Sequence, residues 1–532
     1  MSIVLAVMGV TGLFFVIGHM STPNWRERKL RASGTDCQTK LANFNFGAQT
    51  VMRPWISRTL LVFGVFIIVW FAMIVYWQAT NRMPTSSDVV LYLFAIPTVL
   101  LTALWLIFKG VTMFSAKSND PTTSQTKPDA EAMAQARTAE QERALTLIIL
   151  ASALRAAHGQ TADELTSALA SKKTKLELDN ELKNGEGFPI LSGRIKSVDE
   201  DAQRDAIAAW LVTHNTQEII WTSEQLRAQA LGGEVVTELA QQAITHPQLE
   251  NYMATPLRKR DTVALPTLQL RALLPLHWDA EKRKITAEWF IHLIEQQGWP
   301  SEKIALKSEL PNDHMVPISM VDRLSVDAYR QSLPCFGMVL ACESHVGELT
   351  VSDWENTGRG AGGQGQIPGE GAAGLLLADA QQTMLMNPKS AAKINRIAQN
   401  RRNKSADDKG RSSAETLTEL TKDALLVAAI SPEKITLVTA DTDQRASRVA
   451  ELMAMGLATF PDLDLNTQYL KIAAKCGLAG AASSLTALAL AHHEAAENSS
   501  FALCINNQDG FARAAVVVSP WIPEIASLPT AT

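Results

Sequence analysis

The chain has few cysteines, few aromatic residues and no excess of positive charge. Five cysteines occur among 532 residues, too few for a disulfide-stabilised scaffold. Lysine and arginine total 49 against 54 for aspartate and glutamate, so the basic excess typical of a dedicated nucleic-acid-binding protein is missing. Hydrophobic residues nevertheless make up 46% of the chain, which excludes a protein that is disordered throughout.

The mean hydropathy of +0.01 conceals a contrast between the first 110 residues and the rest. Three long uncharged runs occupy residues 1–18, 59–77 and 89–108. Each is close to the ~20 residues that a helix needs to cross the hydrocarbon core of a bilayer. We therefore predict a membrane region over residues 1–110 with three transmembrane helices. The alternative for the first run is a signal peptide, but no basic residue precedes it and no small-residue cleavage site follows.

Basic residues in the short loops predict the orientation of these helices. Seven lysines and arginines lie between the first two runs, whereas only Arg82 lies between the second and third. Because cytoplasmic loops carry the excess of Lys and Arg, the first loop should be cytoplasmic. We expect a multi-pass protein of the bacterial inner membrane, with its soluble carboxyl-terminal part in the cytoplasm.

The soluble part divides by composition. Residues 111–140 include a proline-containing polar stretch and are predicted to be a flexible linker. Residues 141–330 alternate helix and strand patterns, with a helix over 130–157, a strand over 265–276 and a helix over 281–297, which indicates an α/β region. Residues 387–413 carry eight basic residues against two aspartates. They are expected to form a solvated surface insertion or, alternatively, a contact with anionic lipid or an acidic partner.

The region 331–532 carries the clearest resemblance. Residues 336–341 read as a buried strand that ends in Cys342, Glu343, Ser344 and His345. Residues 367–379 read IPGEGAAGLLLAD, in which Gly369 and Gly371 are expected to permit an unusual backbone turn. A strand over 435–440, a helix over 443–457, a small-residue stretch over 475–491 and a hairpin over 501–518 follow. This order resembles the second half of the thiolase-like and ketoacyl-synthase superfamily, and the resemblance implies a layered α/β/α fold.

The same resemblance implies a catalytic pattern that the chain lacks. Condensing enzymes of this superfamily use a nucleophilic cysteine at a helix start, and no cysteine occurs between Cys37 and Cys335. Two polar stabilising positions of the family hold Ala440 and Leu478. We therefore predict a pseudoenzyme without catalytic, cofactor-binding or metal-binding residues. The runner-up is a thiolase-like acyltransferase or ketoacyl-synthase relative with relocated catalytic residues.

Two further cysteine and histidine groups are interpreted as structural. Cys335 and Cys342 are expected to pack as small hydrophobic residues. His492 and His493 are adjacent on a predicted helix, without the spacing of a metal site. We expect this histidine pair to lie on the surface.

Residues 270–306 carry a second resemblance. They look like the adaptor proteins that load lipase effectors onto the type VI secretion spike, on the strength of Leu274, Pro275, Trp278, Trp289 and the turn at 298–300. This implies a non-catalytic, membrane-tethered adaptor. Its partners would be a secreted effector, a spike protein and the lipid bilayer, with no nucleic acid. The remaining alternative is a structural subunit of an inner-membrane complex.

The positions of the tryptophans in this segment predict whether each is buried or exposed. Trp289 lies on the apolar face of the predicted helix, so we expect it in the core. Trp299 lies in a Gly-Trp-Pro turn, where chain segments commonly reach the surface; the alternative is a packed turn with Trp299 in the core. We name Trp299 and Trp278 as candidate partner-binding residues.

Overall fold

The computed structural model describes residues 144–171, 174–214, 219–307, 317–360, 365–408 and 413–523, together with Trp70 and Glu142. Apart from Trp70, the three apolar runs of residues 1–110 lie outside this part of the chain, as does the whole of the expected linker. Among the described helices, none is both long and apolar enough to cross a membrane. The transmembrane helices and the cellular location remain predictions.

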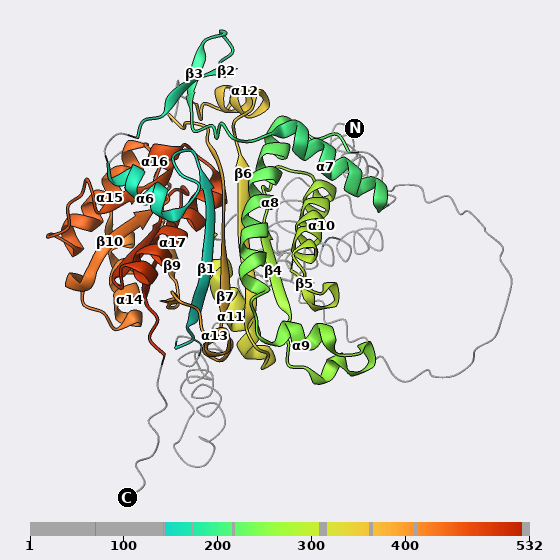
Figure 1. The fold of residues 1–532 in the computed structure, drawn as a ribbon. Helices are drawn as coiled ribbons and strands as arrows, with labels where there is room; N and C mark the ends of the chain where they lie inside the picture. Colours follow the sequence, from blue (N-terminus) through green and yellow to red (C-terminus); the bar gives the residue numbers. More distant parts are fainter. Residues whose placement is uncertain are drawn as a thin grey trace, which may run out of the picture. The chain divides into compact units, whose positions relative to one another are not determined.

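One large mixed sheet organises the described chain (Figure 1). Its strands follow the order β11 (Tyr469–Lys471), β10 (Ile435–Ala440), β12 (Phe501–Asn506), β13 (Ala512–Pro520), β8 (Ala392–Ile394), β1 (Leu147–Ala156), β7 (Glu370–Ala378), β6 (Phe336–Ser344), β4 (Leu268–Leu273) and β5 (Ile304–Leu306). β9 (Ala398–Arg401) also pairs with β13. A separate hairpin consists of β2 (Glu177–Lys183) and β3 (Pro189–Ser192).

The sheet consists of two halves with the same topology. In the amino half, β7 is antiparallel to both β1 and β6, while β6, β4 and β5 run parallel. In the carboxyl half, β13 is antiparallel to both β8 and β12, while β12, β10 and β11 run parallel. β1 and β8 join the halves, with Ile149 opposite Ala392. The chain therefore contains a structural repeat that uses strands from both sides of the boundary expected at residue 330.

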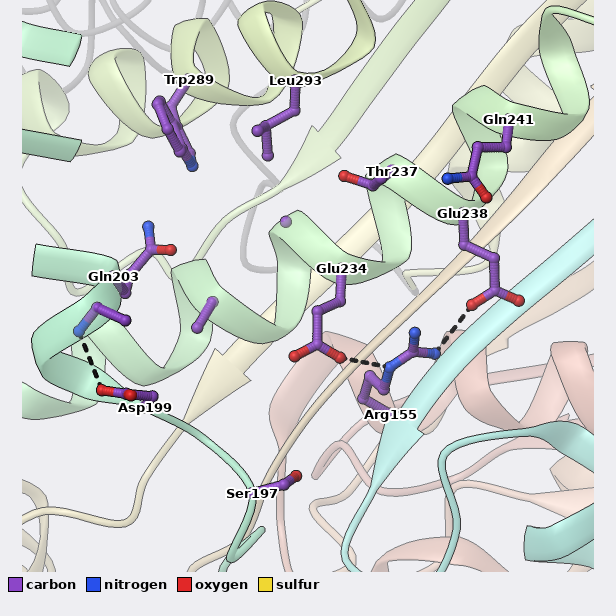
Figure 2. Close-up of a pocket in the computed structure, with 13 residues that line it drawn as sticks. Arg155, Ser197, Asp199, Gln203, Glu234, Thr237, Glu238, Gln241, Trp289 and Leu293 are labelled. Atoms are coloured by element: carbon purple, nitrogen blue, oxygen red, sulfur yellow. Dashed lines mark hydrogen bonds and ion pairs between the residues drawn. The ribbon is translucent and has the colours of Figure 1, made fainter. Parts of the chain in front are cut away.

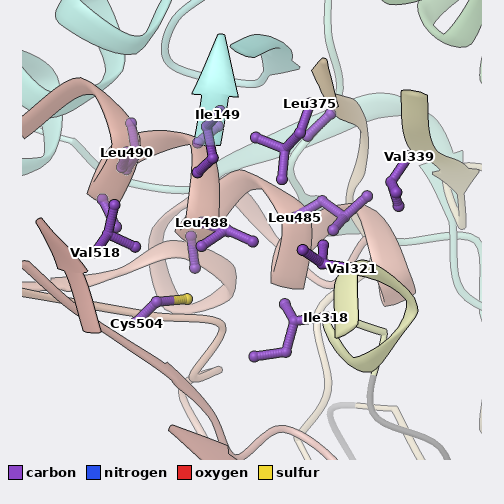
Figure 3. Packing of buried hydrophobic residues seen from close by; sticks show 14 of the residues in the cluster. Ile149, Ile318, Val321, Val339, Leu375, Leu485, Leu488, Leu490, Cys504 and Val518 are labelled. Atoms are coloured by element: carbon purple, nitrogen blue, oxygen red, sulfur yellow. The ribbon is translucent and has the colours of Figure 1, made fainter. Parts of the chain in front are cut away.

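Two helices lie between the halves and carry the main core. They are α17 (Gly480–Glu497) and α11 (Ser319–Gln331). α17 contacts strands of both halves, including β7, β6 and β12. Figure 3 shows Leu485 and Leu488 of α17 among apolar side chains of both halves and of α11: Ile149, Val339, Leu375, Cys504, Val518, Ile318 and Val321. Most side chains of α17 are buried and apolar, as expected of a helix that has little contact with water.

Further helices cover the outer faces of the sheet. α8 (Ser223–Ala243) packs on β6 and β7, and α7 (Glu200–Thr213) and α10 (Ala280–Gln296) pack against α8. α14 (Glu415–Ala428) packs on β13, with α15 (Ala446–Thr459) beside it. Alternate strand residues belong to different cores: Val339 faces α17, whereas Met338 faces the α8 side. The result is a succession of helix, sheet, helix, sheet and helix layers, which confirms the predicted mixed α/β class.

Short helices complete the chain: α6 (Ala162–Ala170), α9 (Gln248–Ala254), α12 (Glu348–Asn356), α13 (Ala380–Met386) and α16 (Ile472–Cys476). The helix predicted over 130–157 is wrong at its carboxyl end, where residues 147–156 form β1. β1 is buried between two antiparallel neighbours at its start, so strand pairing prevails over its alanine-rich composition.

Candidate functional site

The turn before α17 is tied to the turn before β7. Leu478 N–H donates to the Ile367 carbonyl at 2.8 Å, and Gly369 N–H donates to the Leu478 carbonyl at 3.1 Å. A Cβ on Gly369 would lie only 2.6 Å from the carbonyl oxygen of Cys476. The PGEGAA sequence thus needs its first glycine for close backbone approach rather than for a positive φ, which corrects our expectation of an unusual turn.

Glu343, at the end of β6, reaches the first turn of α17. Its Oε2 accepts a hydrogen bond from Ala481 N–H at 3.2 Å. Gly480 has a φ of +47°, and a Cβ there would overlap the Glu343 carboxylate. The amino end of a helix carries a partial positive charge, so it favours the carboxylate form of Glu343.

Burial acts on Glu343 in the opposite direction. The side chain is 13% exposed, and this burial raises its pKa to about 7, although the Ala481 N–H and the Arg359 charge oppose the shift. A carboxyl with this pKa exists in both protonation states near neutral pH. This is the property that a general acid or base needs.

His345 lies beside Glu343, with its Nε2 3.3 Å from Glu343 Oε1. Its ring centroid lies 5.1 Å from that of Trp354 and 6.2 Å from that of His277. Burial lowers the pKa of His345 to about 3, and the nearby His277 and Arg359 charges act in the same direction. At neutral pH His345 is therefore a neutral polar partner of Glu343 rather than a cation.

A second buried carboxyl, Asp441, follows β10 and also meets α17. Ser484 Oγ donates to Asp441 Oδ2 at 2.7 Å, and the N–H groups of Asn507 and Gln508 donate to Oδ1 at 2.8 and 3.2 Å. Burial raises the pKa of Asp441 to about 6 against these hydrogen bonds. Asp441 stands one residue after Ala440, so a buried acid directly follows the position where we expected no polar group.

An apolar groove adjoins the Glu343 cluster. It has a volume of about 790 Å³ and is lined by the β2–β3 hairpin, α12 and the segment before β7. Trp354 lines the groove and also faces His345. Gln366 lines it as well and accepts a hydrogen bond from Arg359 Nε at 2.9 Å. The groove therefore reaches the Glu343 cluster through Trp354, and Glu343 itself is not among its lining residues.

Another groove, of about 600 Å³, lies between α7, α8 and α10 (Figure 2). Its charged residues pair with one another: Arg155 contacts Glu234 at 2.6 Å and Glu238 at 3.0 Å. Asp199 caps α7 by accepting from Ala202 N–H. These interactions account for Arg155, Glu234, Glu238 and Asp199 without a ligand, whereas Gln203 Nε2 and Trp289 Nε1 are buried without a hydrogen-bond partner in the described part of the chain.

The structure places Trp289 and both candidate tryptophans in the core. Trp289 is buried as predicted, in edge contact with Trp210 at 5.6 Å. Trp278 is 3% exposed and Trp299 is 1% exposed. Trp299 stacks on Phe336 at 5.5 Å and donates Nε1–H to the Lys303 carbonyl. Our expectation of an exposed Trp299 is wrong, and a partner-binding role for Trp299 or Trp278 remains a prediction.

The predicted burial of the two cysteines is confirmed, whereas the predicted exposure of His492 is not. Cys335 and Cys342 are buried, as expected. Burial raises the pKa of the Cys335 thiol to about 12 and that of Cys342 further, so neither is ionised at neutral pH. His492 is buried rather than exposed, and His493 is half-buried; the expected surface position of His492 is wrong.

The basic segment 387–413 is more than a solvated insertion. It contributes β8 and β9 to the sheet. Arg402 pairs with the buried Glu451 at 2.6 Å, and Asp407 binds both Arg445 and Arg448, at 2.9 and 2.8 Å. A contact of the remaining basic side chains with lipid stays a prediction.

No family model matches the sequence, and no curated protein matches it. Solved structures do resemble the fold. The ishigamide ketosynthase/chain length factor has 13% identity and a TM-score of 0.46, covering 71% of this chain and 99% of its own. The ketosynthase from module 6 of the bacillaene synthase of Bacillus subtilis 168 has 12% identity and a TM-score of 0.47, covering 71% of this chain and 72% of its own. An oxazolomycin ketosynthase domain of Streptomyces albus JA3453 has 14% identity and a TM-score of 0.44, covering 72% and 75%.

At such low identity these similarities assign no residue role. Our prediction that the chain is not an enzyme does not stand as a finding; the similar solved structures are ketosynthases. The absence of polar side chains at Ala440 and Leu478 does not establish a pseudoenzyme. None of these structures is a type VI secretion adaptor.

The sequence alone named Glu343 and His345 only as the end of a strand. The signal that pointed to them was the run of polar residues after a fully apolar strand. The groups that contact Glu343 and His345, which come from α17 and His277, lie too far away in the sequence for a local pattern to reveal the contact.

Proposed function

We propose that this chain is an acyl-handling enzyme of thiolase-like fold, in which the Glu343 carboxyl transfers protons at the amino end of α17. The proposal rests on Glu343 itself: a largely buried carboxyl whose pKa is raised to about 7, placed beside neutral His345 and the first turn of α17. The cysteine nucleophile of condensing enzymes is not required for this chemistry.

The reaction suited to this arrangement is transfer of an acyl group from a thioester to water or an alcohol. As a carboxylate, Glu343 accepts the proton of the attacking O–H while the new C–O bond forms. The C–S bond then breaks, and the proton on Glu343 passes to the leaving thiolate. The positive end of the α17 dipole lies beside the negative charge that develops on the carbonyl oxygen.

The test is release of free thiol from acyl-coenzyme A thioesters of increasing chain length by the purified protein. Glu343→Gln should lower turnover by ~10²-fold or more, because the proton acceptor is lost. Glu348→Gln, which neutralises an exposed carboxylate on nearby α12, is the matched control and should leave turnover unchanged. Absence of thiol release, or equal turnover by Glu343→Gln and the wild type, would exclude this function.

A second candidate is capture of a partner protein, which the β2–β3 hairpin favours. The hairpin exposes Leu178 and Phe188, each 63% exposed, and it projects from the body of the fold (Figure 1). Apolar side chains at such positions are common anchors for protein partners. The proposed partners are a secreted lipase-type effector and a secretion spike protein, met at a cytoplasmic face of the inner membrane.

Co-purification separates the two candidates. Phe188→Ser should release a bound effector while leaving thioester turnover intact. The control is Leu426→Ser, which removes an even more exposed apolar side chain on α14 (79% exposed) and should retain the partner. If both variants keep the effector, the hairpin is not its binding surface.

A further inference from the structure

A serine and a histidine far apart in the sequence meet where β1 passes the carboxyl-terminal half of α17. Ser152 lies on β1 and His492 lies on α17, and Ser152 Oγ is 2.8 Å from His492 Nδ1. Ser152 is half-buried, whereas His492 is buried. This pair is separate from Glu343: across β7, Ser152 is level with Val339 of β6, which precedes Glu343 by four residues.

The pair opens onto a small polar cavity of about 250 Å³. Its lining comes from β1, α8 and α17, and it includes Gln242, Ser390 and His493. The volume corresponds to roughly eight water molecules at liquid density. It is large enough for a short acyl group.

The charged groups around this cavity are already paired. Glu238 contacts Arg155 at 3.0 Å, and Glu497 accepts a hydrogen bond from Ser390 Oγ at 2.8 Å. His493 lies 4.0 Å from Asp163. Ser152 and His492 are thus bonded to each other and not to these carboxylates.

His492 is a neutral base at physiological pH, since burial and the neighbouring His493 lower its pKa to about 4. In the tautomer with the proton on Nε2, Nδ1 accepts a hydrogen bond from the Ser152 hydroxyl. A serine whose proton is held by a neutral imidazole is an activated nucleophile.

The strand pairing of β1 changes beside this cavity. β8 pairs with residues 147–149 of β1, whereas Ala151 and Ser152 pair with β7 after a register irregularity at Leu150. All three of these residues line the cavity.

We propose that Ser152 and His492 form a nucleophilic dyad that accepts a short acyl group from a carboxylic ester. Ser152 Oγ attacks the ester carbonyl carbon while its proton passes to His492 Nδ1. The ester C–O bond breaks, and the proton moves from Nδ1 to the leaving alkoxide, which departs as the alcohol. The products are an acyl-Ser152 and a free alcohol; water, activated by His492 in the same way, later releases the carboxylic acid.

The experiment treats the full-length protein with a biotin-linked fluorophosphonate and with p-nitrophenyl acetate. We expect the phosphonate on the peptide that contains Ser152, together with a burst of p-nitrophenolate close to one equivalent. Ser152→Ala should abolish the burst, and His492→Gln should slow labelling by ~10²-fold or more. Ser390→Ala removes the other cavity hydroxyl and should retain both signals.

Mass spectrometry of the labelled wild type tests the proposed dyad even if the Ser152→Ala protein fails to fold. Label on Ser152 supports the dyad. No label, or label on another residue that persists in Ser152→Ala, overturns it. Because Glu343→Gln leaves this cavity unaltered, an unchanged burst in that variant separates the dyad from the thioester site.

Discussion

Two glutamates at one end of the amino-half sheet have opposite environments. Glu370 begins β7 and Glu343 ends β6, and their strands pair with Ser344 opposite Glu370. Side chains one register step apart point to opposite faces of a sheet. Glu370 faces the α8 side, where arginine meets it, whereas Glu343 faces α17, where only one backbone N–H meets it.

The number of donors differs sharply between the two carboxylates. Glu370 accepts two hydrogen bonds from Arg227, at 2.8 and 2.6 Å, one from Ile195 N–H at 2.7 Å and one from Ser344 Oγ at 2.9 Å. Glu343 accepts one from Ala481 and touches neutral His345. A carboxylate with all its acceptor sites filled holds the fold together, and one left partly unsatisfied is available for proton transfer.

The largest expected effect is the loss of stability when Glu370, the fully hydrogen-bonded carboxylate, is replaced. Glu370→Ala leaves the guanidinium of Arg227, whose side chain is 6% exposed, without its main partner. Removing one member of a buried pair costs about 3–5 kcal/mol. Urea unfolding of Glu370→Ala should show this loss, and Glu370→Gln, which keeps one acceptor oxygen, should lose less. A change below about 1 kcal/mol in Glu370→Ala would show that water replaces the carboxylate.

Glu343→Gln should instead change how stability depends on pH. Because the folded pKa of about 7 exceeds the ordinary value of 4.5, ionisation of Glu343 opposes folding. Its contribution is fully present below about pH 4.5 and is lost as the pH rises through 7. The shift corresponds to roughly 3 kcal/mol.

The measurement is the free energy of unfolding of wild type and Glu343→Gln from pH 5 to 8. The difference between the two should move in favour of the variant as the pH rises. Asp441, with a pKa of about 6, contributes in the same direction in both proteins and cancels. Parallel curves would show that Glu343 titrates normally and would remove the basis for its proposed role.

The sequence predicted the strands of the carboxyl half well, because short apolar runs bounded by polar residues have few alternatives. β10 occupies residues 435–440 as predicted, and α10 covers the helix expected over 281–297 to within one residue. β1 was missed, since an alanine-rich apolar run suits a buried helix as well as a buried strand. Only its long-range pairing with β7 decides between the two.

The candidate site was harder to predict than the fold. Glu343 meets Ala481 across 138 residues of sequence, and such a contact leaves no local pattern. The expected exposure of Trp299 was wrong for a related reason. A Gly-Trp-Pro turn suggests the surface, but Phe336 and His246, which lie far away in the sequence, pack against this indole. Local rules describe the backbone of a turn and not what packs against it.

The smallest expected change in stability comes from Gly480→Ala, and it tests how Glu343 is positioned. At a φ of +47° alanine costs roughly 1–2 kcal/mol, and its Cβ displaces the Glu343 carboxylate from the first turn of α17. Gly358→Ala is the matched control, because its φ is +69° but no atom lies within 4 Å of the added Cβ. Both variants should lose similar stability in thermal unfolding, whereas only Gly480→Ala should lose thioester turnover. Equal turnover in the two variants would mean that the position of Glu343 against α17 does not matter for the chemistry, and that the unsatisfied carboxyl is as structural as Glu370.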